Sequence, residues 1–233
     1  MNQKTIPKYY IFLSLLVLLF LSFTIAFYPQ NENINNHLDR MILGMVFISC
    51  CIIGISFSIF PGWYKKYLYK KKRIVTQKSK NQVYIQRKGH HPYCNHFKNH
   101  TINIQKKTYC AGCLGLTIGA IIAIIMTIGY VFIYNIQQQT YVIFGMGTSL
   151  ILISFITSLL AETKPVLRVM INILFIIGFF FIIGSAFEHT QNLNFSIISI
   201  IFCILFIQTR ISLSHNQHRK ICQSCSQLCK SYQ

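Results

Sequence analysis

The chain has 233 residues, of which 53% are apolar and only 11% are charged. Soluble domains carry roughly one quarter charged residues, so this composition excludes an ordinary soluble protein and indicates a membrane protein. In a soluble protein the formal net charge of +18 would suggest nucleic acid binding. In a membrane protein the same cations suffice to orient the spans, so we expect no nucleic acid partner.

Six apolar stretches fit membrane spans. A bilayer core of about 30 Å needs roughly 20 apolar residues in a helix, because the backbone finds no water there. We therefore predict an all-α polytopic integral membrane protein with about six transmembrane helices and a small Cys/His loop on the cytoplasmic side. The predicted spans, of which the last is the shortest, are 10–28, 41–60, 114–134, 141–161, 169–187 and 193–209.

The first stretch has an alternative interpretation as a signal peptide. Lys4 and Lys8 precede its apolar run, and residues 24–26 loosely resemble a cleavage site. We favour an uncleaved anchor, because the run is long for a signal core. Cleavage would leave five spans with unchanged orientation.

Positive charge is distributed very unevenly between the two sides. With the amino terminus inside, every lysine and arginine except Arg40 falls on the inner side. Loops rich in these residues stay cytoplasmic, so we predict a cell-membrane protein with both termini in the cytoplasm. The predicted regions are spans one and two (1–64), a basic cytoplasmic loop with a Cys/His motif (65–113), spans three to six (114–209) and a cytoplasmic tail containing cysteines (210–233).

The basic loop begins next to the membrane. A dense run of cations at 65–73 follows Trp63 and Tyr64, two residue types that favour the membrane interface. We expect this run to lie against the lipid bilayer and to contact anionic headgroups.

The spans contain little that suggests transport. No Asp, Glu, Lys, Arg or His falls within the six predicted cores, and Glu188 and His189 are expected at a span end that water can reach. We interpret three cysteines in the spans as small buried hydrophobic residues: Cys50, Cys51 and Cys203. In the third span, small residues spaced four apart predict close packing against another helix: Ala111, Gly115, Gly119 and Ala123.

The chemistry of this sequence is concentrated between residues 89 and 119. His91-x2-Cys94 and, fifteen residues later, Cys110-x2-Cys113 have the spacing of a zinc ribbon in which histidine replaces one cysteine. Two such turns supply four donors for a tetrahedral Zn²⁺. Alternation at 100–104 and a return at 108–110 predict a small hairpin that would bring the halves together.

Other residues could substitute for these ligands. His90, His96 and His100 compete with His91 for the imidazole position, and His100 ranks second to it. A second cluster, Cys222-x2-Cys225-x3-Cys229, closes the chain. It could complete the loop's site, form another site with His215 or His218, hold an iron-sulfur cluster, or remain an exposed reduced tail.

The sequences GHHPYC and CAGCLGLTIGA, about twenty residues apart, carry a resemblance. They resemble a group of uncharacterised archaeal multi-pass membrane proteins. More distantly, they are similar to prokaryotic membrane proteins of unknown function that have a Cys-His-x-x-Pro element followed by Cys-x-x-Cys-x-Gly. His91, Cys110, Cys113 and Gly115 match that pattern, whereas His90 replaces its leading cysteine and Cys94 is additional. The resemblance implies a metal or redox loop in a membrane protein and no known activity.

Two functions follow from these residues. In the first, zinc joins the cytoplasmic loop to the membrane domain of a structural, sensing or scaffold protein. Four protein ligands leave no open position for water, so hydrolysis is not expected and an enzyme is less favoured than a non-enzymatic role. In the alternative, Cys110 and Cys113 act as a membrane thiol-disulfide oxidoreductase and exchange electrons with Cys94 or the tail thiols. Transport is the least favoured class.

Overall fold

The computed structural model describes residues 6–28, 37–59, 100–104, 107–132, 139–159 and 164–223. These residues form an all-α polytopic membrane protein in which six helices are long and apolar enough to cross a membrane. One two-stranded hairpin accompanies them. The elements are α1 (Ile6–Phe27), α2 (His37–Ile59), β1 (Thr101–Ile104), β2 (Lys107–Cys110), α4 (Ala111–Phe132), α5 (Thr140–Leu159), α6 (Pro165–Thr190) and α7 (Leu193–Gln223).

The six predicted spans are confirmed, but five of the helices begin one to four residues before the predicted starts, and α6 and α7 end later than predicted. Helix α6 begins at Pro165, earlier than predicted, because proline lacks an N–H and is tolerated in the first turn of a helix. Helix α7 continues past Thr209 to Gln223. The apolar run ends near Thr209, but the backbone hydrogen bonding of a helix does not require apolar side chains.

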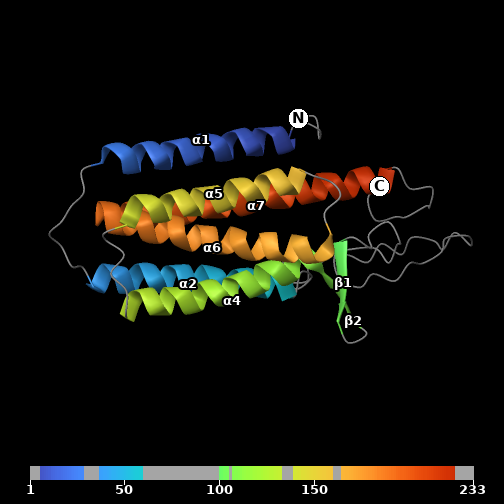
Figure 1. Cartoon of the computed structure of the whole chain (residues 1–233), viewed down its shortest axis with the longest axis horizontal. Coiled ribbons are helices and arrows are strands. Elements are labelled where there is room, and N and C mark those ends of the chain that lie inside the picture. The colour runs from blue at the N-terminus through green and yellow to red at the C-terminus, as the bar shows by residue number, and fades with distance from the viewer. Residues whose placement is uncertain are drawn as a thin grey trace, which may run out of the picture.

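The helices lie along one common axis in an elongated bundle (Figure 1). Helix α6 is central and packs against α4, α5 and α7, whereas α2 packs on α4 and α1 on α7. In the most apolar stretch of α6, 50% of the residues are buried inside the bundle. The corresponding share in the other five helices is 22–39%. The hairpin lies at the same end of the bundle as the N and C labels of the chain (Figure 1).

Small residues bring α4 and α6 into close contact, as the predicted stripe requires. A Cβ added to Gly115 would lie 2.5 Å from the Val169 carbonyl oxygen, and one added to Gly119 would lie 3.0 Å from Ile173 Cα. Helices α4 and α6 both run away from the hairpin end, so they are parallel (Figure 1). Their amino-terminal ends therefore lie at the same end of the bundle.

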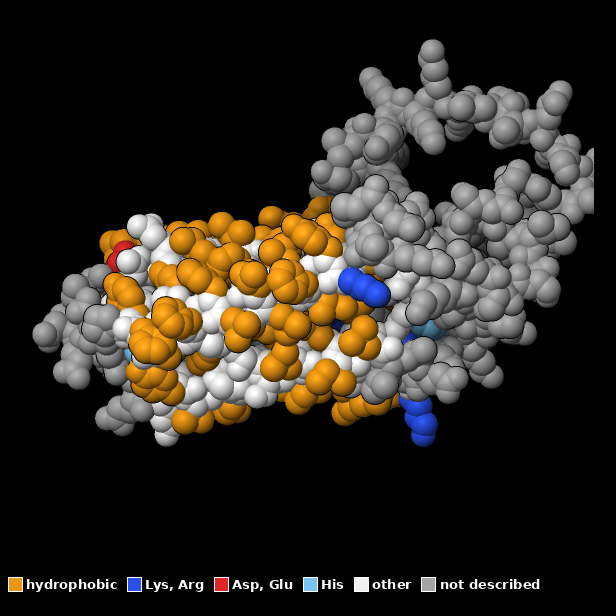
Figure 2. Space-filling view, turned by 90° about the horizontal axis from the view of Figure 1, so that it is seen from above, with side chains coloured by type: hydrophobic (Ala, Val, Ile, Leu, Met, Phe, Trp, Pro, Cys, Tyr) orange, Lys and Arg blue, Asp and Glu red, His pale blue; other side chains and the backbone are white. Residues whose placement is uncertain are grey.

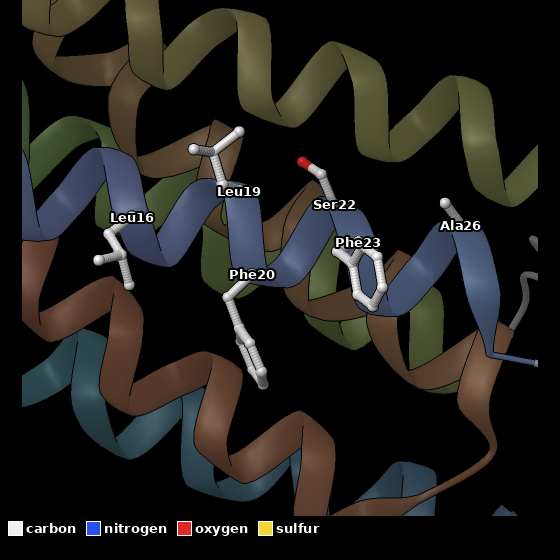
Figure 3. Close-up of a pocket in the computed structure, with 6 residues that line it drawn as sticks. All are labelled: Leu16, Leu19, Phe20, Ser22, Phe23 and Ala26. Carbon is white, nitrogen blue, oxygen red and sulfur yellow. The ribbon is translucent and has the colours of Figure 1, made fainter.

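Apolar side chains cover the length of the bundle, as expected for a surface that faces lipid (Figure 2). Along α1 they form a shallow groove (Figure 3), lined by Leu16, Leu19, Phe20, Ser22, Phe23 and Ala26. Inside the bundle, Cys51 and Cys203 are buried and Cys50 is partly buried, which agrees with their prediction as small hydrophobes.

Only Gln191 and Asn192 connect α6 to α7. Gln191 adopts the left-handed conformation with φ 48° and donates its N–H to the Phe187 carbonyl at 2.7 Å. The Asn192 side chain accepts a hydrogen bond from the Asn194 N–H at 2.9 Å, which caps the start of α7. This turn lies at the end of the bundle opposite the hairpin (Figure 1).

The prediction that water reaches Glu188 and His189 is wrong, because both side chains are fully buried. Glu188 pairs with Arg40 of α2 at 2.8 Å and accepts a hydrogen bond from Tyr130 of α4. The Nε2 atom of His189 lies 3.0 Å from the Tyr28 carbonyl oxygen. Neighbouring helices enclose these groups, and sequence position at a span end does not reveal this enclosure.

Candidate functional site

Cys110 and Cys113 lie where the hairpin meets the membrane bundle. Cys110 is the last residue of β2, which pairs antiparallel with β1 so that Thr101 faces Cys110. Helix α4 starts at the next residue, and Cys113 falls in its first turn. The two side chains are within hydrogen-bonding reach of each other. The predicted hairpin is therefore confirmed, and it leads directly into the paired thiols.

Helix α2 supports this first turn of α4 through hydroxyl groups. Ser58 donates a hydrogen bond to the Cys113 carbonyl at 2.7 Å, and its side chain also reaches the Cys113 thiol. Thr117 Oγ1 lies 3.0 Å from the same carbonyl oxygen and 2.9 Å from Ser58 Oγ. The backbone that carries Cys113 is thus held against the end of a second membrane helix.

His100 takes a different position from the one expected of a metal ligand. Its side chain is buried, and its Nδ1 atom lies 2.7 Å from Arg168 Nη1. Guanidinium groups only donate hydrogen bonds, so Nδ1 must accept and the neutral ring then carries its hydrogen on Nε2. Neither ring nitrogen offers a lone pair to a metal in this arrangement. His100 connects the hairpin to α6 instead.

Two arginines accompany the thiols. Arg168 lies in the first turn of α6, and Arg210 lies on α7 with its guanidinium 5.3 Å from the centre of the Phe175 ring. They are close enough to repel each other, and Arg210 interacts electrostatically with both thiols. Arg168 therefore adds positive charge near Cys110, and Arg210 adds it near both Cys110 and Cys113.

Sequence reasoning treated Arg168 and Arg210 only as signals of orientation. Each lies one residue outside a predicted span, which could have drawn attention to them, because helices commonly extend past the apolar run. Their proximity to the thiols could not have been predicted, since α4, α6 and α7 meet only through the tertiary packing of the bundle.

The other predicted ligands fall mostly outside the described residues. His90, His91, Cys94 and His96 lie there, as do Cys225 and Cys229. Of Cys222 and His218 only the helical backbone of α7 is described, and His215 is exposed on the same helix. Of the four preferred ligands, the structure thus describes Cys110 and Cys113 and brings them together.

No larger group of metal ligands is formed by the described part of the chain. Within it, no three His, Cys, Asp or Glu side chains lie close enough together to hold a metal ion. A site with four protein ligands would have to draw its remaining donors from residues outside that part. His91 and Cys94 belong to residues 60–99, which separate α2 from His100 in the sequence and lie outside the described part of the chain.

Comparison with known proteins gave no match: neither a family model, nor a curated protein, nor a solved structure is similar to this chain.

Proposed function

We propose that this protein is a cell-membrane protein with both termini in the cytoplasm, whose Cys/His loop binds zinc and serves a structural, sensing or scaffold role. The observation that carries the proposal is the meeting of the Cys110 and Cys113 thiols at the start of α4. His91 and Cys94 would complete a tetrahedral site with them. The tail residues Cys222, Cys225 and Cys229 are the alternative donors.

Nearby positive charge would offset part of the cost of burying thiolates at this position. Three thiolates, one neutral imidazole and Zn²⁺ carry one negative charge together, and Arg210 interacts with both described thiols. The amino-terminal end of α4 also favours negative charge at Cys110 and Cys113. A bound metal would therefore gain from an environment that otherwise has an excess of cations.

Elemental analysis of protein purified in detergent tests this function. We expect about one zinc ion per chain, since a structural site with four ligands binds a single metal. Cys110→Ser and Cys113→Ser should each lose the metal, because a hydroxyl does not replace a thiolate ligand. Cys203→Ser, a change at a buried cysteine away from the site, is the matched control. Zinc content that Cys110→Ser leaves unchanged would rule the site out.

The adjacency of the two thiols also favours a second candidate function, thiol-disulfide exchange. In that reaction Cys110 and Cys113 would lose two electrons and two protons to a partner disulfide, which would be reduced to two thiols. Alkylation after metal removal and after mild oxidation distinguishes the candidates. A reversible disulfide between Cys110 and Cys113 in untreated protein would favour exchange, whereas protection of both thiols by zinc would favour the metal site.

A further inference from the structure

Arg168 and Arg210 form a cationic pair that no carboxylate neutralises within the described part of the chain. The neighbour of Arg168 is His100, a hydrogen-bond acceptor without negative charge in this contact. The Nε atoms of both arginines are buried, and neither has a hydrogen-bond partner among the described residues. Two partly buried guanidinium groups that repel each other, each with a buried Nε donor left unused, favour the binding of an anion.

The acidic residues of the chain can hardly supply that anion. There are four Asp and Glu residues in all. Asp39 and Glu188 belong to the opposite end of the bundle, and the end of α1 and the start of α2, which flank Glu32 in the sequence, lie at that same opposite end (Figure 1). Glu162, in the connection between α5 and α6, falls outside the described residues. A single glutamate could balance at most one of the two guanidinium charges.

Helix geometry adds to the positive field at this point. Helices α4 and α6 are parallel and in contact, so the positive ends of both helix dipoles lie at the end that holds the two arginines. Arg168 itself occupies the first turn of α6, where a cation is disfavoured and an anion is stabilised. Asn172, one turn later, keeps a buried side-chain oxygen without a partner in the described structure. A hydroxyl on the ligand could donate to that oxygen.

We propose that Arg168 and Arg210 bind a phosphate group at this end of the bundle, apart from any metal held by the thiols. The planar guanidinium fork matches phosphate oxygens, and its donors would then be used. The group could belong to an anionic lipid headgroup at the membrane surface or to free phosphate. This proposal does not depend on zinc binding.

Binding of radiolabelled inorganic phosphate to the full chain in detergent, by equilibrium dialysis, is the first measurement. The double variant Arg168→Gln/Arg210→Gln should bind phosphate at least roughly tenfold more weakly, because each hydrogen bond to a charged group stabilises by more than a neutral one. Lys164→Gln is the matched control, since it removes an exposed cation four residues before Arg168. Its affinity should change less than about twofold, as expected for an exposed charge.

The second measurement counts phosphatidylglycerol molecules that stay with the protein after transfer from mixed phosphatidylglycerol and phosphatidylcholine nanodiscs into detergent. If phosphatidylglycerol is retained only when both arginines are present, and inorganic phosphate does not bind, the bound phosphate group belongs to a lipid headgroup. Binding of inorganic phosphate that needs both arginines would identify a soluble one. Either result supports the proposal.

Further variants keep the test decisive. Arg168→Lys/Arg210→Lys retains the charge but loses the guanidinium fork, so it should fold and bind with intermediate affinity. Cys110→Ser/Cys113→Ser should keep full phosphate binding even if zinc is lost, which separates this proposal from the metal site. The proposal would be overturned if Arg168→Gln/Arg210→Gln bound phosphate as tightly as the wild type. It would also be overturned if Lys164→Gln lost as much affinity as that double variant. Loss of phosphate binding in the double cysteine variant would overturn it as well.

Discussion

At the scale of single residues, the buried pair of Arg40 and Glu188 is the strongest electrostatic contact described far from the thiols. Their side chains join α2 to α6 at 2.8 Å, and the Arg40 guanidinium also lies 5.1 Å from the centre of the Tyr130 ring. Glu188 is fully buried, so its carboxylate relies on these neighbours for hydrogen bonds. The pair thus links three helices at the end opposite the thiols.

Breaking this pair should destabilise the protein strongly. We expect Glu188→Ala to lower the free energy of unfolding by about 3–5 kcal/mol, because a buried Arg40 charge would lose its partner. The double variant Arg40→Met/Glu188→Met should lose less than either single change, since it leaves no buried charge. Chemical unfolding in detergent measures all three. Losses that simply add in the double variant would show that the two charges do not interact.

At the scale of elements, the contact between α4 and α6 depends on the absence of a side chain at Gly115. We expect Gly115→Ala to destabilise the protein by about 1–3 kcal/mol, because the added methyl would overlap the Val169 carbonyl and Asn172. Gly129→Ala in the same helix is the matched control, since its added Cβ has nothing within 4 Å. Thermal unfolding in one detergent compares the two. Equal effects of both substitutions would mean that helix propensity, not packing, dominates.

The hairpin is the element that places Cys110 next to the membrane helices. Its last pair, Thr101 with Cys110, is followed at once by α4, so a change in register would move the thiol to the other face of the strand. We therefore expect Ile102→Pro, which removes a strand donor, to lower zinc content without replacing any ligand. Elemental analysis checks this outcome. Thr24→Ala, a change at an exposed hydroxyl of α1, controls for the purification and should retain zinc.

At the scale of the whole molecule, the sidedness of the bundle decides which compartment the thiols face. The start of α1, the end of α7 and the hairpin lie at one end of the bundle (Figure 1), and we expect that end to be cytoplasmic. A membrane-impermeant thiol reagent applied to intact cells should therefore leave Cys94 and Cys110 unlabelled. Asn33→Cys, between α1 and α2, should be labelled under the same conditions. Labelling of Cys94 in intact cells would reverse the assigned orientation.

Much of this architecture could be predicted from the sequence, because apolar run length alone defines the spans 10–28 and 41–60. The stripe at Gly115 and Gly119 predicted close packing, but its partner α6 could not be identified from one sequence. The burial of Glu188 and the position of Arg210 beside the thiols were missed for a common reason. Both depend on contacts between helices that are distant in the chain, and no local periodicity records such contacts.

The turn of Gln191 and Asn192 has a consequence for biogenesis. With only these two residues between them, α6 and α7 form a tight helical pair that we expect the translocon to release into the bilayer as one unit. An epitope or glycosylation tag inserted here would separate the Gln191 N–H from Phe187 and displace Glu188 beside it. The loop is therefore a poor site for inserting reporter tags, although a connection between two spans is usually a convenient place for them.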